Sequence, residues 1–179
     1  FRSELKNAPQ GVAFLLFDCD RFKTINDTYG HAKGDRVLSI IADALVMALR
    51  ANDRLYRLGG DEFATFLSRT TPAQAKQIAQ RCQSLLDASV FSDLGINEPV
   101  GISIGIAFCA ADQLEHINDL PKQADIAMYT AKQPGRTRIA LYGEDTERAS
   151  QTLVASRETS ALFQALASPG MIEMHYQSI

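Results

Sequence analysis

The sequence has few cysteines, and they show no pairing pattern. Cys19, Cys82 and Cys109 are widely spaced, and no Cys-x-x-Cys or Cys/His cluster with zinc spacing occurs. This argues against a disulfide framework and a structural zinc site. We expect free, buried thiols in a reducing compartment.

Long apolar runs, low-complexity tracts and an excess of one charge are also missing. No run approaches the length of a membrane span, and no signal peptide is recognisable. The net charge of −3 at pH 7 does not indicate a nucleic-acid binder or a basic membrane-surface protein. The abrupt start at Phe1 and stop at Ile179 suggest a fragment. We expect a cytoplasmic domain and leave open a membrane anchor or sensor in the parent protein.

What is present fits one soluble domain with some additional chain. Of the 179 residues, 46% are hydrophobic and 22% are charged, which is typical of a globular protein with a buried core. Apolar runs predict strands over residues 12–17, 54–58, 62–67, 100–108 and 138–142. Apolar periodicity predicts helices over residues 22–29, 35–50, 71–85 and 121–132, with Asp35 as a candidate N-cap.

The order of these elements, β-α-α-β-β-α-β-α-β, predicts the fold class. Gly59-Gly60 lies between two apolar runs, which indicates a tight hairpin. A hairpin among alternating strands and helices implies an α/β (α+β) fold with a ferredoxin-like mixed central sheet flanked by helices. Residues 144–166 have scattered apolar positions and are predicted to form one linking helix.

Two acidic pairs are the first candidates for chemistry. Asp18 and Asp20 end the first buried strand, and Asp61 and Glu62 follow the Gly-Gly pair. If the hairpin neighbours that strand, the acids converge and suit Mg²⁺, which binds one or two carboxylates together with substrate phosphates. Acidic pairs at strand ends and turns are otherwise ordinary solvated residues, and this alternative stays open.

Other polar residues allow two interpretations each. Lys132 and Arg136 complement a helix dipole at the end of the fourth predicted helix, or they clamp phosphates. Asn26 is either a turn residue or a reader of a purine edge, and Asp35 is either an N-cap or a second such reader. Arg50 and Asp53 form an Arg-x-x-Asp step whose simplest role is a weak local ion pair.

Four sequence blocks, in order over about 130 residues, carry a resemblance to a known family. They are FDCDRFKTINDTYGHAKGD (17–35), RLGGDEF (57–63), SIGIA (103–107) and ADIAMYTAKQPGR (124–136). Together they resemble the GGDEF family of diguanylate cyclases. The resemblance implies a fold like that of nucleotidyl cyclases and the polymerase palm.

The resemblance also implies roles for individual residues. It implies that Mg²⁺ (or Mn²⁺) is held by Asp18, Glu62 and the backbone carbonyl of Cys19, and that Asp61 occupies a variable acidic position of the catalytic signature. Lys132 would be catalytic and would bind phosphate. The implied GTP-binding residues are Phe22, Lys23, Asn26, Asp35, Gly60, Lys132 and Arg136. Asp20 matches the motif without an assigned role, and Pro134 departs from the usual Lys-to-Arg spacing.

A regulatory site and a second domain follow from the same resemblance. Arg50 and Asp53 match an inhibitory site for cyclic di-GMP, to which Arg81 would add a second arginine. Residues 171–179 resemble the first strand of an EAL phosphodiesterase, with Ser178 in place of the usual proline. We therefore expect a GGDEF domain over 1–143, a linker helix over 144–170 and the start of a truncated EAL domain over 171–179.

The implied function is that of a nucleotidyltransferase. Two GTP molecules would condense into cyclic di-GMP with release of two pyrophosphates, in a homodimer that contributes one GTP per domain, with product feedback and without a nucleic-acid partner. The alternative is a catalytically silent GTP-binding module that regulates an attached EAL phosphodiesterase. The intact signature favours the enzyme.

Overall fold

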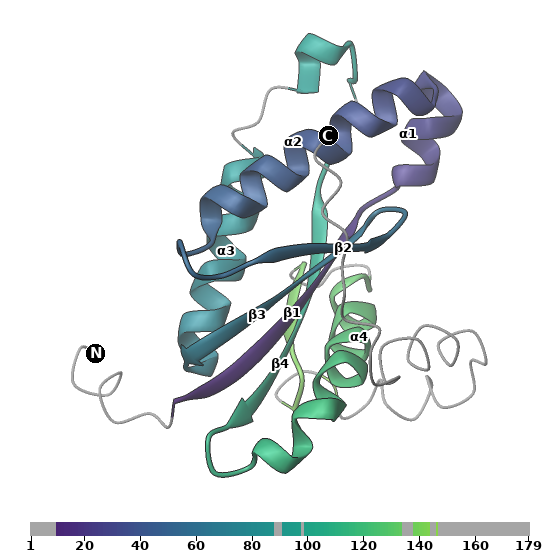
Figure 1. The fold of residues 1–179 in the computed structure, drawn as a ribbon. Helices are drawn as coiled ribbons and strands as arrows, with labels where there is room; N and C mark the ends of the chain where they lie inside the picture. Colours follow the sequence, from purple (N-terminus) through teal and green to yellow (C-terminus); the bar gives the residue numbers. More distant parts are fainter. Residues whose placement is uncertain (1–9, 88–90, 98, 134–137, 144–145, 147–179) are drawn as a thin grey trace.

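A five-stranded mixed sheet forms the centre of the protein, in the order β2-β3-β1-β4-β5. The computed structural model describes residues 10–87, 91–97, 99–133, 138–143 and 146 (Figure 1). β1 is antiparallel to both β3 and β4, while β4 and β5 are parallel. The predicted mixed sheet is thereby confirmed. The strand bounds are Gly11–Cys19 (β1), Leu55–Gly59 (β2), Glu62–Thr70 (β3), Ile102–Ala110 (β4) and Ile139–Leu141 (β5).

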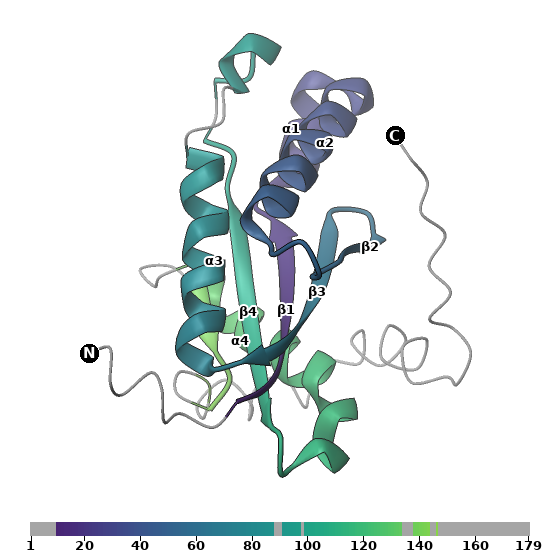
Figure 2. The ribbon, with the colours of Figure 1, turned by 60° about the vertical axis from the view of Figure 1, so that its left-hand side comes forward.

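Among the described residues, four α-helices cover the two faces of this sheet (Figure 2). They are α1 (Phe22–Tyr29), α2 (His31–Ala48), α3 (Pro72–Asp87) and α4 (Leu120–Ala131). The predicted order of elements is confirmed. In the part of the chain that the structure describes, two short 3-10 helices, Phe91–Leu94 and Leu114–Asp119, were not predicted, because such short turns carry no amphipathic period. None of the described helices is long and apolar enough to cross a membrane.

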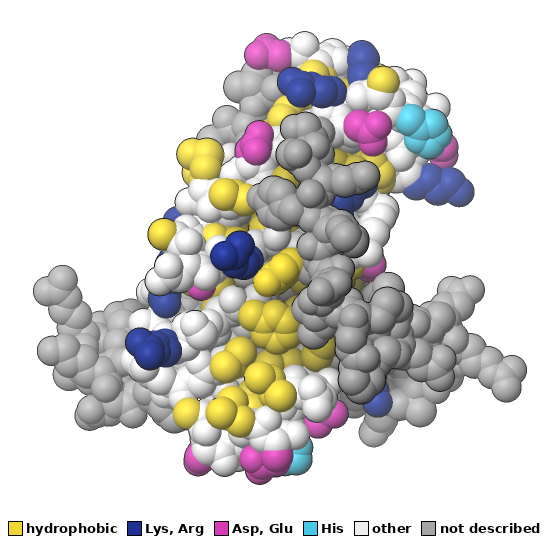
Figure 3. Space-filling view, viewed as in Figure 1, with side chains coloured by type: hydrophobic (Ala, Val, Ile, Leu, Met, Phe, Trp, Pro, Cys, Tyr) yellow, Lys and Arg dark blue, Asp and Glu magenta, His cyan; other side chains and the backbone are white. Residues whose placement is uncertain are grey.

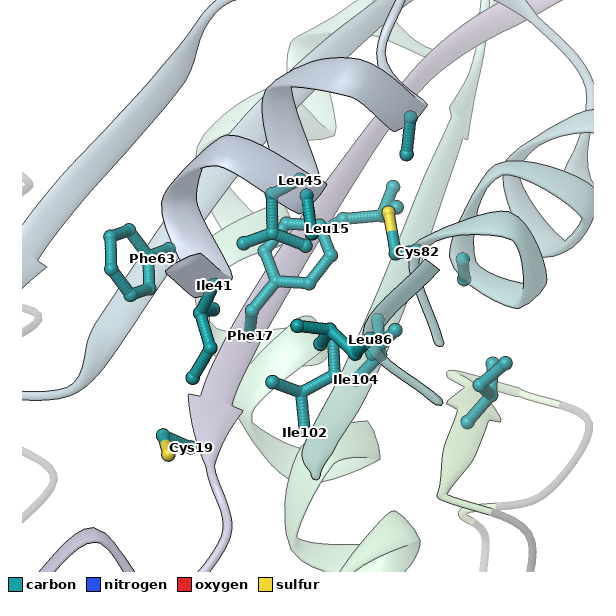
Figure 4. Packing of buried hydrophobic residues seen from close by; sticks show 14 of the residues in the cluster. Leu15, Phe17, Cys19, Ile41, Leu45, Phe63, Cys82, Leu86, Ile102 and Ile104 are labelled. Carbon is teal, nitrogen blue, oxygen red and sulfur yellow. The ribbon is translucent and has the colours of Figure 1, made fainter. Parts of the chain in front are cut away.

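Strand β1 supplies both faces of the sheet, because successive side chains of a strand point in opposite directions. Leu15 and Phe17 join the core beneath α1, α2 and α3, where Ile41 and Ile104 also pack (Figure 4). Phe14 and Leu16 join a second, smaller core beneath α4. The other buried members of the second core are Ala64, Ala107, Cys109, Leu120, Ala124 and Met128.

The start of α2 differs from the prediction. The helix begins at His31, so Asp35 lies in its second turn and is not the N-cap. Gly30, with φ of 84°, turns the chain directly from α1 into α2, and no longer loop is needed. The two helices pack closely, because a Cβ atom at Gly34 would overlap the side chain of Asn26. Asn26 is therefore a helical residue rather than a turn residue, and Asp35 is an exposed residue within α2 rather than its N-cap.

Helix α4 covers only part of the second face. The backbone of α4 approaches β4 so closely that a Cβ atom at Gly105 would lie 2.5 Å from the Met128 nitrogen. Beside α4, hydrophobic side chains gather over the sheet at the centre of Figure 3. Phe66 on β3 is 40% exposed, and its ring centroid lies 4.7 Å from that of Phe14. The second face is thus tightly packed under α4 and more open over β3.

Candidate active site

The central acids of the sequence motifs meet on the α4 face of the sheet. Asp18 near the end of β1 and Glu62 at the start of β3 are directly opposite in the antiparallel register, and Ser103 of β4 is opposite Asp18 on the other side. Opposed residues in such a pair project from the same face, with Cβ atoms about 4.5–5.5 Å apart. The structure therefore brings together two carboxylates that are 44 positions apart in the sequence (62 minus 18).

Lys132 reaches this acid pair from the end of α4. Its Nζ lies 2.8 Å from Asp18 Oδ1, and the Asp18 side chain is only 13% exposed. Lys132 is also the C-cap residue of α4, where a cation complements the helix dipole. Both interpretations of this residue fit the structure, because the helix ends beside the acids.

The carboxylates are held where a negative charge is unfavourable. Burial raises the pKa of Asp18, and this effect outweighs the hydrogen bond and charge of Lys132. Burial likewise raises the pKa of Glu62, with further increases from Asp18, Asp61 and Asp125. Carboxyl groups crowded in this way favour a neighbouring cation, which would relieve their mutual repulsion.

Asp125 was missed in the sequence analysis. It lies on α4, half-buried, and its own pKa is raised by burial. The signal was its spacing: Asp125 precedes Lys132 by seven residues, or two helical turns, so both project from nearly the same side of the helix. The sequence alone did not indicate that this side faces the acids.

The carbonyl oxygen of Cys19 is the third predicted metal-binding group at this end of β1. Its thiol is buried among apolar residues, and burial and then the nearby acids raise its pKa to about 12, so it is not a reactive group. The Asp20 N–H donates to the Gly101 carbonyl at 2.9 Å. The Cys19 carbonyl belongs to the same planar trans peptide as the Asp20 N–H and therefore points in the opposite direction. That direction is toward β3, where Glu62 lies.

The Cys19 carbonyl accepts no hydrogen bond from the part of the chain that the structure describes. Unpaired backbone carbonyls at buried residues are uncommon, and Cys19 is 2% exposed. A carbonyl oxygen and two carboxylates are the kind of oxygen donors that Mg²⁺ binds, together with phosphate oxygens and water. Within the described ranges, no group of three or more His, Cys, Asp or Glu side chains is placed to hold a metal ion.

The Gly-Gly hairpin lies next to these donors. Gly60 has φ of 51°, a conformation that glycine adopts without a steric penalty. Its carbonyl accepts two hydrogen bonds from Arg57, from Nη2 at 2.7 Å and from Nε at 3.1 Å. No heavy atom would lie within 4 Å of a Cβ atom at Gly60, so the bend leaves open space beside the acids.

The predicted nucleotide-binding residues of α1 and α2 lie beyond the end of β1. Phe22 and Lys23 form the first turn of α1, directly after Arg21, which adopts a left-handed conformation with φ of 60°. Asn26 Oδ1 is buried and has no hydrogen-bond partner among the described residues. Asp35 is exposed on α2. Arg136 and Pro134 lie outside the described residues, so their placement stays a prediction.

The Arg-x-x-Asp step lies in a different place, after the end of α2. The Asp53 carboxylate accepts a hydrogen bond from the Arg50 N–H at 3.1 Å, and the Asp53 N–H donates to the Arg50 carbonyl at 2.9 Å. Asp53 therefore stabilises a turn. No ion pair between the two side chains occurs among the described residues. The third predicted residue, Arg81, is exposed on the neighbouring helix α3.

The fold and the acid pair together define a mixed-sheet α/β domain with a cation-favouring site at the end of its central strand. The sequence profile described as "Diguanylate cyclase, GGDEF domain" matches residues 1–138. The chain therefore belongs to the GGDEF family of diguanylate cyclases. The four sequence blocks that suggested this family all lie within the matched range.

Individual relatives include both cyclases and phosphodiesterases. The chain is 40% identical over 131 residues (73% of this chain) to "Diguanylate cyclase A" of Treponema denticola, and 31% identical over 176 residues (98% of this chain) to "Cyclic di-GMP phosphodiesterase PdeB" of Shewanella oneidensis. It spans 35% and 20% of the length of these relatives.

A solved structure has the same fold. The GGDEF domain of YfiN (TpbB) from Pseudomonas aeruginosa is 39% identical and superimposes with a TM-score of 0.64, covering 79% of this chain and 87% of that one. The predicted linker over 144–170 and EAL strand over 171–179 fall, apart from Thr146, outside the described residues.

Proposed function

We propose that this domain is an active diguanylate cyclase, which condenses two GTP into cyclic di-GMP and two pyrophosphates as a homodimer. The observation that carries the proposal is the convergence of Asp18, Glu62 and the unpaired Cys19 carbonyl beside Lys132. The family assignment and the name of the Treponema relative support the reaction.

Each domain holds one GTP. Asp18, Glu62 and the Cys19 carbonyl would hold Mg²⁺ or Mn²⁺, which would supply charge neutralisation at the α-phosphate and activation of the attacking hydroxyl. Lys132 exchanges its contact with Asp18 for the phosphates as the nucleotide arrives, joined by Arg136, by Lys23 and by the backbone amides at the start of α1. Asn26 and Asp35 read the guanine edge, and the bend at Gly60 admits the ribose and phosphates.

The reaction joins two such domains. The 3′-hydroxyl of one GTP attacks the α-phosphorus of the other, a new P–O bond forms, the bond to the β-phosphate bridging oxygen breaks, and pyrophosphate leaves. A second, symmetric step closes the ring. Because each domain supplies one half, a two-fold homodimer presents both nucleotides face to face, and catalysis rests mainly on positioning and electrostatics.

The test is the Glu62→Gln variant. We expect cyclic di-GMP formation from GTP and Mg²⁺, measured by chromatography on an enforced dimer, to fall by at least about 100-fold, because a metal ligand is lost. Asp43→Asn is the matched control, since Asp43 is an exposed carboxylate on α2. An unchanged rate in Glu62→Gln would refute the metal assignment.

A silent regulatory module is the second candidate. The name of the Shewanella relative, which aligns over 98% of this chain, favours it. In that case the domain would bind GTP and adjust an attached EAL phosphodiesterase. GTP binding without turnover in an enforced dimer, with activity changes only in the full-length protein, would identify this function.

Product feedback is the finer part of the proposal. Arg50, Asp53 and Arg81 would bind cyclic di-GMP, with the arginines paired to its phosphates. Arg50→Ala should weaken cyclic di-GMP binding in calorimetry by about 10-fold or more, the usual effect of losing a charged hydrogen bond. Arg36→Ala is the control, because Arg36 is an exposed arginine within α2, away from the Arg-x-x-Asp step. Equal affinity in Arg50→Ala would exclude this site.

A further inference from the structure

Asp20, the residue directly after β1, is anchored at three points. Its N–H donates to the Gly101 carbonyl at 2.9 Å, and its Oδ1 accepts from Ser103 Oγ at 2.7 Å. Its Oδ2 lies 3.1 Å from Arg138 Nη1, a charge contact without hydrogen-bond geometry. All three partners belong to the β4–β5 side of the sheet, so Asp20 ties the end of β1 to that side.

The position of the Arg138 guanidinium is itself restricted. A Cβ atom at Gly101 would overlap Arg138 Nη1 and lie 3.2 Å from Asp20 Oδ2, so a side chain at position 101 would displace the guanidinium from this place. The Arg138 carbonyl accepts a hydrogen bond from the Ile104 N–H at 2.8 Å, immediately before the β4–β5 ladder begins. The backbone and the side chain of Arg138 are therefore both held against β4.

This anchoring acts on the peptide bond that carries the Cys19 carbonyl. The Cys19 N–H donates to the Asp61 carbonyl at 3.3 Å on the β3 side, and the Asp20 N–H donates to Gly101 on the β4 side. Rotation of the Cys19–Asp20 peptide would break the bond to Gly101 and would pull the Asp20 carboxylate away from Ser103. Three contacts of one residue thus keep the carbonyl directed toward the side where Glu62 lies.

We propose that Asp20 is a positioning residue, which together with Ser103 and Arg138 holds the Cys19 carbonyl in place as a metal ligand. The inference rests on the proposed metal site. In this proposal Asp20 is not itself a metal ligand, because Ser103 donates a hydrogen bond to its Oδ1 and the Arg138 guanidinium faces its Oδ2. Groups that orient a ligand in this way typically change metal affinity by about 10- to 100-fold when they are removed.

The rival explanation is that Asp20 is itself a metal ligand, and the Arg138→Gln variant separates the two. If Asp20 positions the carbonyl, the loss of Arg138 loosens the anchor and weakens metal binding. If Asp20 binds the metal directly, the loss of Arg138 frees a carboxylate from a competing cation and leaves metal binding unchanged or stronger.

The experiment compares wild type, Asp20→Asn, Arg138→Gln and the double variant. Calorimetry measures the affinity for guanosine 5′-(α,β-methylene)triphosphate with saturating Mn²⁺ and again in EDTA, and the ratio gives the gain due to the metal. We expect each single variant to lower this gain by about 10-fold. The double variant should lose no more of the gain than the single variant with the larger loss, because both changes remove the same anchor. The affinity in EDTA should stay unchanged. Amide exchange at residue 20, followed by NMR without metal, should become faster in both single variants.

Controls keep the outcomes separate. Asp43→Asn should behave as wild type, and Ser103→Ala, which removes one anchor only, should give a smaller loss in the same direction. An unchanged gain in Asp20→Asn, or an unchanged or larger gain in Arg138→Gln, would overturn the positioning role. No gain from Mn²⁺ in wild type, or a full gain in Glu62→Gln, would instead refute the proposed metal site.

Discussion

The two faces of the sheet differ in what they do with the same strands. On the face beneath α1, α2 and α3, the side chains of β1 are apolar to the end of the strand: Leu15, Phe17 and the Cys19 thiol are all buried. On the α4 face, Phe14 and Leu16 of β1 are also buried, but the next side chain along the strand is the acid Asp18. Asp18 lies next to Glu62 and Lys132. The site therefore lies where the cover of the second face ends.

This difference has a physical reason. If α4 covered this end of the sheet completely, the acids would have neither water nor a cation beside them. Ionised carboxylates are not tolerated in such a buried, unpaired place. At the end of α4 they are partly buried, so their pKa values rise without the groups leaving contact with solvent. The α1–α3 face provides stability, whereas the α4 face provides a site at the expense of complete burial.

The largest expected effect comes from disturbing the contact between α4 and β4. Gly105→Val would place side-chain atoms against the Ala124 carbonyl and the Met128 nitrogen, both of which are backbone atoms that cannot move aside independently. We expect a loss of about 3 kcal/mol or more in the free energy of unfolding, in the upper range of overpacking effects. Urea denaturation followed by circular dichroism measures it.

Gly143→Ala is the matched control. A Cβ atom there would meet no atom within 4 Å, and only the positive φ of 95° opposes it. The expected loss is about 1 kcal/mol. Equal losses in the two variants would show that close packing of α4 does not set the stability of the second face.

The next two variants compare the covered and the open parts of the sheet. Leu15→Ala removes a side chain that is 0% exposed in the larger core, and we expect a loss of about 2–5 kcal/mol. Phe66→Ala removes a larger side chain that is 40% exposed beside α4, and we expect only about 1 kcal/mol, mainly from its contact with Phe14.

The order of these two losses is the informative result, because the phenylalanine variant deletes more atoms. If Phe66→Ala cost as much as Leu15→Ala in the same urea experiment, the open part of the second face would be as important for stability as the covered core. The distinction between the two faces would then be wrong.

The comparison also shows which features could be predicted from the sequence. Local patterns were sufficient for the strands and helices and for the hairpin that brings Glu62 beside Asp18. The start of α2 was predicted wrongly, because a favourable N-cap residue at Asp35 was preferred over the backbone turn at Gly30.

Contacts between distant segments could not be predicted. The approach of Asp125 to Glu62 depends on how α4 packs against the sheet, and the Asp20–Arg138 pair depends on the position of β5. Neither packing leaves a pattern in the local sequence. Lys132 is an intermediate case: its place at a helix end was predictable, whereas its contact with Asp18 was not predicted.

The smallest expected effect is the only stabilising one. It tests whether the charge of Glu62 on the α4 face is unfavourable for folding. The pKa of Glu62 is raised above its ordinary value of 4.5, chiefly by burial, so the folded protein favours the protonated form. Between that value and the raised pKa the folded state binds more protons than the unfolded state, and stability falls as pH rises through this window. Above the window the unfavourable effect of the charge is fully present.

Glu62→Gln should therefore be more stable than wild type at pH 7 in EDTA, and the difference should shrink toward pH 4 as the wild-type carboxyl becomes protonated. The gain should be smaller than the loss in Phe66→Ala, because the half-buried carboxylate is still screened by solvent. Asp43→Asn, an exposed carboxylate, should show no such pH dependence. A loss of stability in Glu62→Gln at pH 7 would mean that attraction to Lys132 outweighs burial and the repulsion among the acids. The end of the sheet that carries Asp18 and Glu62 would then be a source of stability, and the contrast between the two faces would fail.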